Sequence, residues 1–300
     1  MNGIKNKVGF FVFFVFVINS IIAQAPPKEL KAEEFLKKAA EFMGKDNKKA
    51  LDLLNQALKI DPKYGIAYSG RGIVYHDMKK YNRAITEHNK AIKLDPTYLP
   101  AYLNKGGVYR DMKKYARAIA EYDKAIKLDP AYCRAYLARG DIYCLVYDYE
   151  FAISDFTKAI EIDPMNAYAY TRRARAYGNR YGSERKSFDD YGKAINIFIS
   201  QIDKLPENIN ELKHDLANTY YYRSKISMAD GYIGDAISDL EYAVELEPSN
   251  EHILYSLGDL KNKRIELIKE QEQKRFPMIL LEKVEHFFKC YQVIKLLRIH

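Results

Sequence analysis

The sequence repeats itself with a period of 34 residues through its central part. The copy from Thr97 to Pro130 finds matching residues 34 positions earlier and 34 positions later. In this central copy the repeated residues are Tyr102, Gly106, Tyr109, Tyr115, Ala118, Ala125, Asp129 and Pro130. A period of this length is typical of solenoids, in which each repeat is one supersecondary unit that contacts mainly its neighbours. The repeat therefore predicts an array of stacked units, stabilised by contacts between neighbours.

Each copy is expected to form two helices. Tyr102, Gly106 and Tyr109 are spaced four and three residues apart, so they share one face of a first helix. The same spacing then recurs on a second helix, at Tyr115, Ala118, Tyr122 and Ala125. Small residues allow the two helices to approach closely where they cross. Pro130 ends the second helix because it lacks a backbone donor and biases the preceding residue away from helical angles.

These residues resemble the tetratricopeptide repeat (TPR) family, whose pattern of a large residue, a small residue, aromatics, alanines and a closing proline they match. The resemblance implies an all-α fold, a solenoid of helix hairpins wound into a right-handed superhelix and ended by a solvating capping helix. It also implies a non-enzymatic scaffold or adaptor for protein–protein interaction. Its ligand groove would lie on the concave face, which the first helices of the hairpins build.

The pattern predicts about six hairpins over residues 32–250, preceded by a linker at 26–31. Their closing prolines are Pro62, Pro96, Pro130, Pro164, Pro206 and Pro248. The last two prolines each follow their predecessor by 42 residues, so eight residues are added in each of these hairpins. We expect a longer loop at 180–187 in the fifth hairpin, and a first helix lengthened toward its N-terminus in the sixth. A terminal helix at 251–276 and an amphipathic tail at 277–300 follow.

Residues 1–25 are typical of a secretory signal peptide. Lys5 and Lys7 precede an apolar run from Gly9 to Ile18, and small residues at Ala23 and Ala25 supply two alternative cleavage sites. We therefore expect an exported protein of the bacterial envelope, either periplasmic or secreted. An uncleaved N-terminal membrane anchor is the alternative.

The tail carries a broad apolar stripe at helical spacing, with basic residues elsewhere on the helical wheel. Three interpretations compete for residues 278–300. The segment could cover the end of the array, pair with a partner's helix, or lie on an anionic membrane surface. The last interpretation gives an alternative function, that of a membrane-surface adaptor.

No motif in the sequence indicates catalysis. GxSxG, Walker and GxGxxG sequences are absent, and the six histidines and three cysteines have no metal-ligand spacing. We therefore expect no catalytic residue, no metal and no cofactor. The net charge of +8 comes from interspersed charges of both signs, so nucleic acid is not the expected partner. One regular basic row is expected to pair with acidic residues of neighbouring hairpins: Arg71, Lys105, Arg139, Arg173 and Arg223.

The TPR resemblance places the residues beside the Tyr-Gly-Tyr stripe on the concave face. They include Ser69, Ile73, His76, Leu103, Asn104, Gly107, Arg134, Leu137, Asp141, Tyr168, Arg172 and Arg175. We expect the ligand groove at Asn104, Arg134, Tyr168, Arg172 and Arg175. Three guanidinium groups beside an aromatic ring suit a protein or peptide partner that is acidic or that offers a C-terminal carboxylate. A solvated or internally paired arginine face is the alternative.

Overall fold

A computed structural model describes residues 27–180, 182–204 and 209–270, and all regular structure in these ranges is helical. The predicted signal segment and the predicted tail lie outside the described residues. Within the described ranges, no helix has the length and apolarity needed to cross a membrane.

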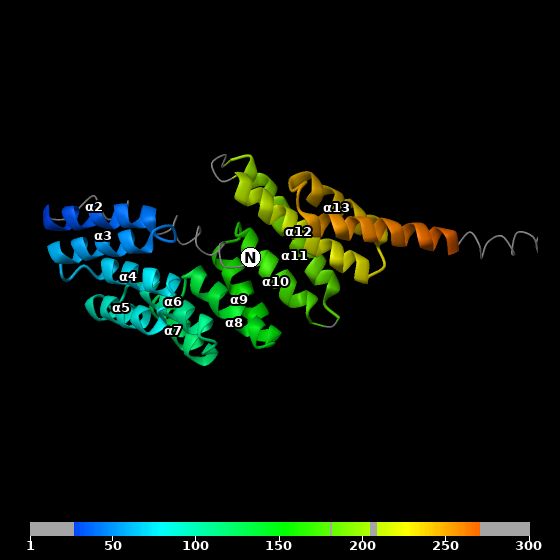
Figure 1. Ribbon diagram of the computed structural model, residues 1–300. Helices are drawn as coiled ribbons and strands as arrows, with labels where there is room; N and C mark the ends of the chain where they lie inside the picture. The colour runs from blue at the N-terminus through cyan, green and yellow to red at the C-terminus, as the bar shows by residue number, and fades with distance from the viewer. Residues whose placement is uncertain (1–26, 181, 205–208, 271–300) are drawn as a thin grey trace, which may run out of the picture. The chain divides into compact units, whose positions relative to one another are not determined.

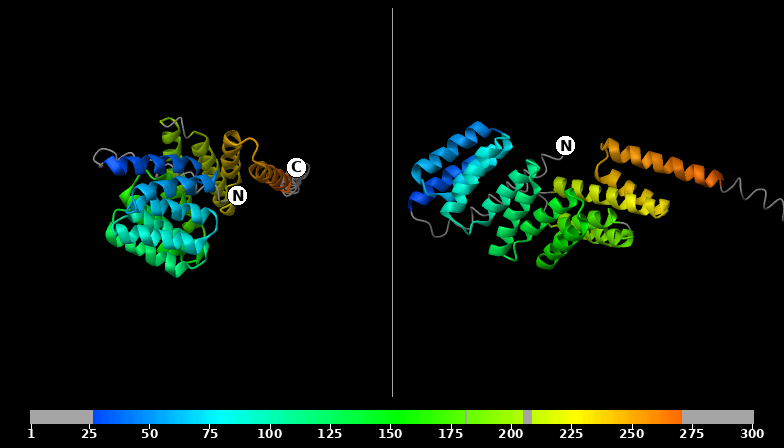
Figure 2. Two further views of the ribbon diagram at one scale, coloured as in Figure 1. Left: turned by 60° about the vertical axis from the view of Figure 1, so that its left-hand side comes forward. Right: turned by 90° about the horizontal axis from the view of Figure 1, so that it is seen from below.

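The chain divides into two compact units, Met1–Ala176 and Tyr177–His300. In the first unit consecutive helices pack in antiparallel pairs (Figures 1 and 2). The pairs are α2 (Pro27–Phe42) with α3 (Asn47–Ile60), α4 (Gly65–Asp77) with α5 (Tyr81–Leu94), α6 (Leu99–Asp111) with α7 (Tyr115–Leu128), and α8 (Cys133–Leu145) with α9 (Tyr149–Ile162). Helix α10 (Ala167–Gly178) follows, and the boundary between the units falls within it. The all-α hairpin repeat predicted from the 34-residue period is confirmed.

The second unit contains α11 (Glu184–Ile202), α12 (Ile209–Ala229), α13 (Ile233–Leu246) and a helical segment at 251–270. Helix α12 packs against both α11 and α13. It has 21 residues, and its added turns precede Tyr220, as expected. The expectation of a long loop at 180–187 is wrong, because α11 already begins at Glu184 and extends for 19 residues, against 14 for α9. An amphipathic pattern continuing through Phe198 explains the longer helix, because it keeps one face buried for an additional turn.

The α4–α5, α6–α7 and α8–α9 hairpins are each closed by a glycine of the first helix that faces a ring of the second. A Cβ atom added to Gly72 would lie 2.6 Å from the ring of His88, and one added to Gly140 would lie 2.6 Å from the ring of Phe156. Gly106 faces the ring of Tyr122 in the same way. No other residue type would let the two backbones approach this closely, so the repeated glycine serves helix packing.

The turns between hairpins are built by the repeated Asp-Pro pairs. The Asp95 carboxylate accepts a hydrogen bond from the Thr97 amide at 2.8 Å, and Asp61 and Asp129 make the equivalent bond two residues on. Such a bond fixes a tight turn just after the helix. The Tyr102 hydroxyl then donates to the Pro96 carbonyl at 3.0 Å, which attaches the next first helix to this turn.

The first helices form the inner layer of the first unit. Successive first helices contact each other directly, α2 with α4, α4 with α6 and α6 with α8, in addition to their contacts with second helices. Among the described residues, successive second helices make no contact of comparable extent. Because the first helices are the more closely spaced layer, they line the concave face of this unit, where solenoids bind their ligands.

Candidate functional site

A row of alternating charges crosses the concave face of the first unit. His76 Nε2 of α4 lies 2.8 Å from Asp111 Oδ2 of α6, and the same carboxylate accepts from Arg110 Nε at 2.9 Å. On the next pair of first helices, Asp141 of α8 lies 3.4 Å from Arg172 Nε of α10. We call these five residues the cross-helix charge chain. All five side chains are partly exposed, so the chain is open to solvent and to a ligand.

The pKa values of the central pair reflect this arrangement. Burial acts to raise the pKa of Asp111, but the hydrogen bonds from His76 and Arg110 outweigh it and hold the pKa below its usual value. Burial likewise acts to lower the pKa of Arg110, yet the hydrogen bond and charge of Asp111 raise it overall, and Asp141 contributes in the same direction. Asp141 acts electrostatically on Arg110, and this links the two halves of the cross-helix charge chain. Arg110 and Asp111 therefore remain ionised at neutral pH, and each partly balances the charge of the other.

Four of the residues expected on the concave face are buried: Ser69, Leu103, Leu137 and, described below, Asn104. Leu103 and Leu137 belong to hydrophobic clusters, and Ser69 is fully buried with its Oγ 3.4 Å from His88 Nδ1. Their expected place in the groove is wrong, because Ser69 faces the second helix of its own hairpin, and Leu103 and Leu137 pack against the second helix and the following first helix. Spacing along one helix does not reveal how closely the next helix approaches.

Asn104 is placed between the core and the groove. Its side chain is buried on α6, and its Oδ1 has no hydrogen-bond partner among the described residues. A buried polar atom without a partner costs free energy unless water or a ligand group reaches it. Gly107, one turn further on, has open space where a side chain would stand, since no atom of its surroundings lies within 4 Å of an added Cβ.

The remaining predicted residues lie on α8 and α10. Arg134 is partly buried on α8, and burial lowers its pKa. On α10, Tyr168 and Arg175 are exposed. Arg172 contacts Asp141 through a partly exposed ion pair, so its charge is partly balanced within the protein. Arg110 and Asp111 were not predicted as site residues. They stand 34 and 35 residues after His76, about one repeat further along the chain.

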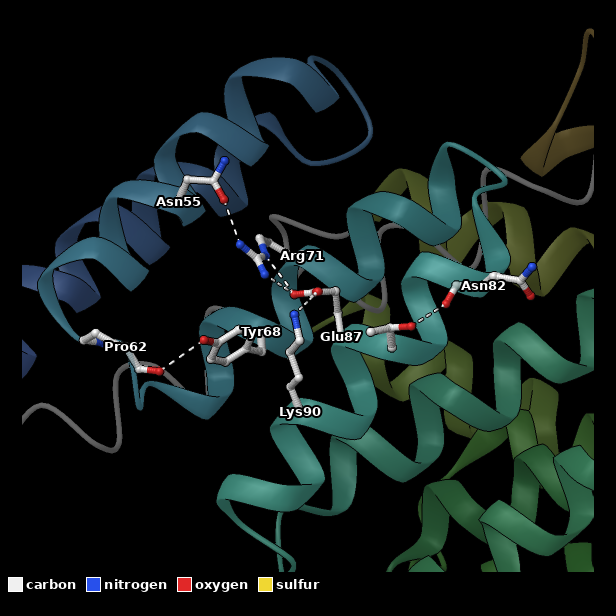
Figure 3. Close-up of polar contacts among 8 residues, drawn as sticks. Asn55, Pro62, Tyr68, Arg71, Asn82, Glu87 and Lys90 are labelled. Atoms are coloured by element: carbon white, nitrogen blue, oxygen red, sulfur yellow. Dashed lines mark hydrogen bonds and ion pairs between the residues drawn. The ribbon is translucent and has the colours of Figure 1, made fainter.

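The regular basic row has a structural role, as expected, but most of its partners differ from the expectation. Arg71 of α4 binds Glu87 of α5, in its own hairpin, and also donates to Asn55 of α3 at 2.9 Å (Figure 3). Lys105 and Arg223 also pair within their own hairpins, with Glu121 at 3.0 Å and Asp239 at 2.6 Å.

Arg139 makes the expected contact with the neighbouring hairpin. It pairs with Asp155 of its own hairpin at 2.7 Å and with Asp123 of the preceding one. The own-hairpin carboxylate stands 16 residues after the basic residue, and the preceding partner 16 residues before it. These side chains therefore hold helices of the array together through ion pairs, and they do not form a ligand site.

The described residues contain no group of histidine, cysteine, aspartate and glutamate side chains that could hold a metal ion. Cys133 and Cys144 are free thiols on α8, as their helical separation predicts. Burial raises the pKa of both, that of Cys144 to about 11, so neither thiol is activated as a nucleophile at neutral pH.

Comparison with known proteins agrees with this architecture. A family model described as a TPR repeat matches residues 106–145, and one described as a tetratricopeptide repeat matches residues 67–98. No curated protein matches the sequence. The structure is similar to that of PilW, a widely conserved type IV pilus biogenesis factor, with 21% identity, a TM-score of 0.62, and coverage of 78% of this chain and 100% of PilW.

It is also similar to the thermophilic TPR protein TTC0263 of Thermus thermophilus, with 18% identity, a TM-score of 0.50, and coverage of 63% of this chain and 98% of that protein. At these identities the two likenesses support the fold alone. The two repeat models, with the stacked helix hairpins, show that this chain contains tetratricopeptide repeats.

Proposed function

We propose that this protein is a non-enzymatic interaction scaffold that binds a peptide segment of a partner protein on the concave face of its first helices. The support comes from an inner layer of closely spaced first helices and from polar side chains along that layer. TPR arrays use this kind of surface for protein–protein interaction.

The observation that carries the proposal is the set of guanidinium groups on neighbouring first helices. Arg110 lies on α6, Arg134 on α8, and Arg172 and Arg175 on α10. A peptide with an acidic segment or a free C-terminal carboxylate would replace Asp141 as the partner of Arg172, because guanidinium groups bind carboxylates through two parallel hydrogen bonds. Such a peptide could also offer an amide donor to the buried Oδ1 of Asn104.

The test uses acidic peptides with free and with amidated C-termini as probes. Replacing Arg172 and Arg175 with Ala should weaken binding of the free-carboxylate peptides by about 1–3 kcal/mol, and high salt should reduce this difference. Asp141→Asn should have the opposite effect, because it removes the internal competitor for Arg172. Lys158→Ala is a control for loss of positive charge outside this face, since it removes a cation from an exposed pair with Glu161 on a second helix.

Titration calorimetry measures both effects. Equal affinities of the parent and of the arginine double variant for every acidic peptide would remove this face as the binding site. A preference for the free carboxylate over the amide identifies a terminal carboxylate as the ligand, and equal binding of the two identifies an internal acidic segment.

We further propose that the protein acts in the bacterial envelope after export. The order of basic, apolar and small residues in positions 1–25 supports this location. Intact mass measurement of the exported protein should find a chain that begins at Gln24 or Pro26. A full-length species retained in the membrane would instead indicate an N-terminal anchor.

A further inference from the structure

The turn between α8 and α9 has lost the polar character of the equivalent turns before it. The α4–α5 and α6–α7 turns have lysines in their middle and an arginine shortly after, at Lys79, Lys80 and Arg83 and at Lys113, Lys114 and Arg117. The α8–α9 turn has Leu145, Val146, Tyr147, Asp148, Tyr149, Glu150 and Phe151 over the same stretch, with apolar or acidic residues where the earlier turns have basic ones. We call residues 145–151 the aromatic turn, and residues 111–117 the basic turn.

The apolar side chains of the aromatic turn do not fill the core. Tyr147 is 78% exposed, Phe151 58% and Leu145 49%. The ring of Phe151 stacks on that of Tyr143 at 5.3 Å, and Tyr147 meets Tyr149 edge-on at 6.4 Å, so the turn carries two pairs of contacting rings. Contiguous exposed apolar side chains of this kind mark interaction sites, because a solvated turn gains nothing from them.

Tyr147 also occupies a backbone position that disfavours it. Its φ is +63°, the left-handed region, and the turn has the hydrogen bonds of a Schellman motif, with the Asp148 amide donating to the Tyr143 carbonyl at 2.8 Å. The equivalent positions are Gly231 after α12 and, in the two preceding turns, Lys79 and Lys113, each at φ +58°. The left-handed position is therefore shared by these turns, and what distinguishes Tyr147 is its exposed ring, which fills no part of the core.

The neighbouring basic turn has the complementary character. Lys113 and Lys114 are exposed and make no ion pair within the described part of the chain, and Arg117 lies 5.8 Å from the ring of Tyr109. Asp148 of the aromatic turn stands at the position of Lys114, so the two turns differ in sign at matching places. Both turns lie at the same end of adjacent hairpins, because each connects a first helix to its second helix.

Two adjacent, complementary patches on one edge satisfy the requirement of a two-fold interface. A two-fold axis between the turns places the aromatic turn of one copy on the basic turn of the other, and the contact is made twice. The rings of Tyr147 and Phe151 would then face lysine and arginine side chains, and Asp148 would face Lys114 of the second copy.

We propose that the aromatic turn docks on the basic turn of a second copy of this chain and joins two copies in a symmetric dimer. The exposed rings supply the apolar contact, and the lysines, Arg117 and Asp148 set the register.

The first experiment is sedimentation velocity of the full mature chain over a range of concentrations. The parent should sediment as a dimer that dissociates on dilution and in high salt. Tyr147→Lys with Phe151→Arg should raise the dissociation constant by about tenfold or more while leaving the fold intact. Both new residues already occupy the equivalent positions of the two preceding turns, so the turn accommodates them. Tyr255→Lys is the control, because it removes a ring that is 77% exposed elsewhere.

The second experiment exchanges the charges. Asp148→Lys alone and Lys114→Asp alone should each weaken the dimer, because each places like charges opposite one another. A mixture of the two single variants should form a heterodimer, and the variant with both changes should dimerise again. Tyr147→Gly should raise the melting temperature yet weaken the dimer, which a purely structural role of the ring does not produce.

A parent that remains monomeric up to its solubility limit would overturn the proposal. So would a dimer that Tyr147→Lys with Phe151→Arg leaves unchanged, or charge variants that fail to restore each other. If the monomeric parent binds acidic peptides and the aromatic-turn variants do not, the turn belongs to the peptide-binding surface instead.

Discussion

Gly106 and Gly107 are adjacent in α6 but have opposite surroundings. A Cβ on Gly106 would overlap the ring of Tyr122, which is almost fully buried and cannot move aside, whereas a Cβ on Gly107 meets no atom within 4 Å. Gly106→Ala should therefore lower the free energy of unfolding by about 1–3 kcal/mol through overpacking. Gly107→Ala should be neutral, or stabilising by up to about 1 kcal/mol, because alanine favours helix.

Urea denaturation of the two single variants measures this difference. The matched pair separates helix packing from the concave face, since both changes add one methyl group to the same helix. Gly106→Ala with unchanged stability and lost peptide binding would contradict the packing role.

His88 occupies the ring position that Tyr122 and Phe156 fill in the next two hairpins. It is completely buried, and its Nε2 has no hydrogen-bond partner within the described residues. Burial, with smaller contributions from His76 and Lys105, lowers its pKa from 6.5 to about 3. The folded chain therefore keeps His88 neutral, while the unfolded chain takes up a proton below its ordinary pKa.

This difference predicts acid sensitivity of the fold. The contribution of His88 to the free energy of unfolding is complete above pH 6.5 and should decline as the pH falls from there toward about 3. At pH 5 the loss should be about 2 kcal/mol relative to pH 8. His88→Phe should remove this decline, so the gap between parent and variant in denaturation curves should change with pH. A constant gap from pH 8 to pH 5 would show that His88 does not titrate differently in the two states.

At the scale of the helices, ion pairs join elements that the repeat pattern alone does not connect. Arg139 joins α8 to α9 through Asp155 and to α7 through Asp123. Its removal leaves the nearly buried carboxylate of Asp155 without its cation, and burial already raises the pKa of Asp155. We expect Arg139→Ala to cost about 1.5–3 kcal/mol in unfolding free energy.

The comparison for this prediction is Lys158→Ala, which removes an exposed pair on α9 and should leave the free energy of unfolding nearly unchanged. Adding Asp155→Asn to Arg139→Ala should recover part of the loss, because no unpaired carboxylate is then buried. If Arg139→Ala costs no more than Lys158→Ala in calorimetry, the row of basic residues does not hold the hairpins together.

At the scale of the whole chain, the end of the second unit lacks a covering element within the described residues. The helix at 251–270 buries Ile253 and Leu260 but leaves Ile265 and Ile268 about half exposed. Deleting residues 271–300 should lower the melting temperature and increase binding of an apolar dye, if the tail covers this helix. Liposome flotation tests the alternative, because an unchanged melting temperature with lost binding to anionic vesicles would make the tail a membrane element.

The sequence by itself determined the repeating unit. The spacing of Tyr102, Gly106 and Tyr109 and the Asp-Pro pairs are local features, because helical periodicity and tight turns involve residues only a few positions apart. Two antiparallel helices per repeat, the free thiols of α8 and the lengthening of α12 were all predictable on this basis.

Tertiary structure decided which neighbours each side chain meets. Leu103 and Leu137 are buried rather than facing the groove because they pack against the second helix and the following first helix. Helix α11 is longer than the repeat predicts because its buried face continues to Phe198. The pairing of Arg172 with Asp141 depended on the distance between two first helices. The repeat specifies each helix pair locally, whereas contacts between helices depend on the three-dimensional stacking of successive pairs, which periodicity along the chain does not encode.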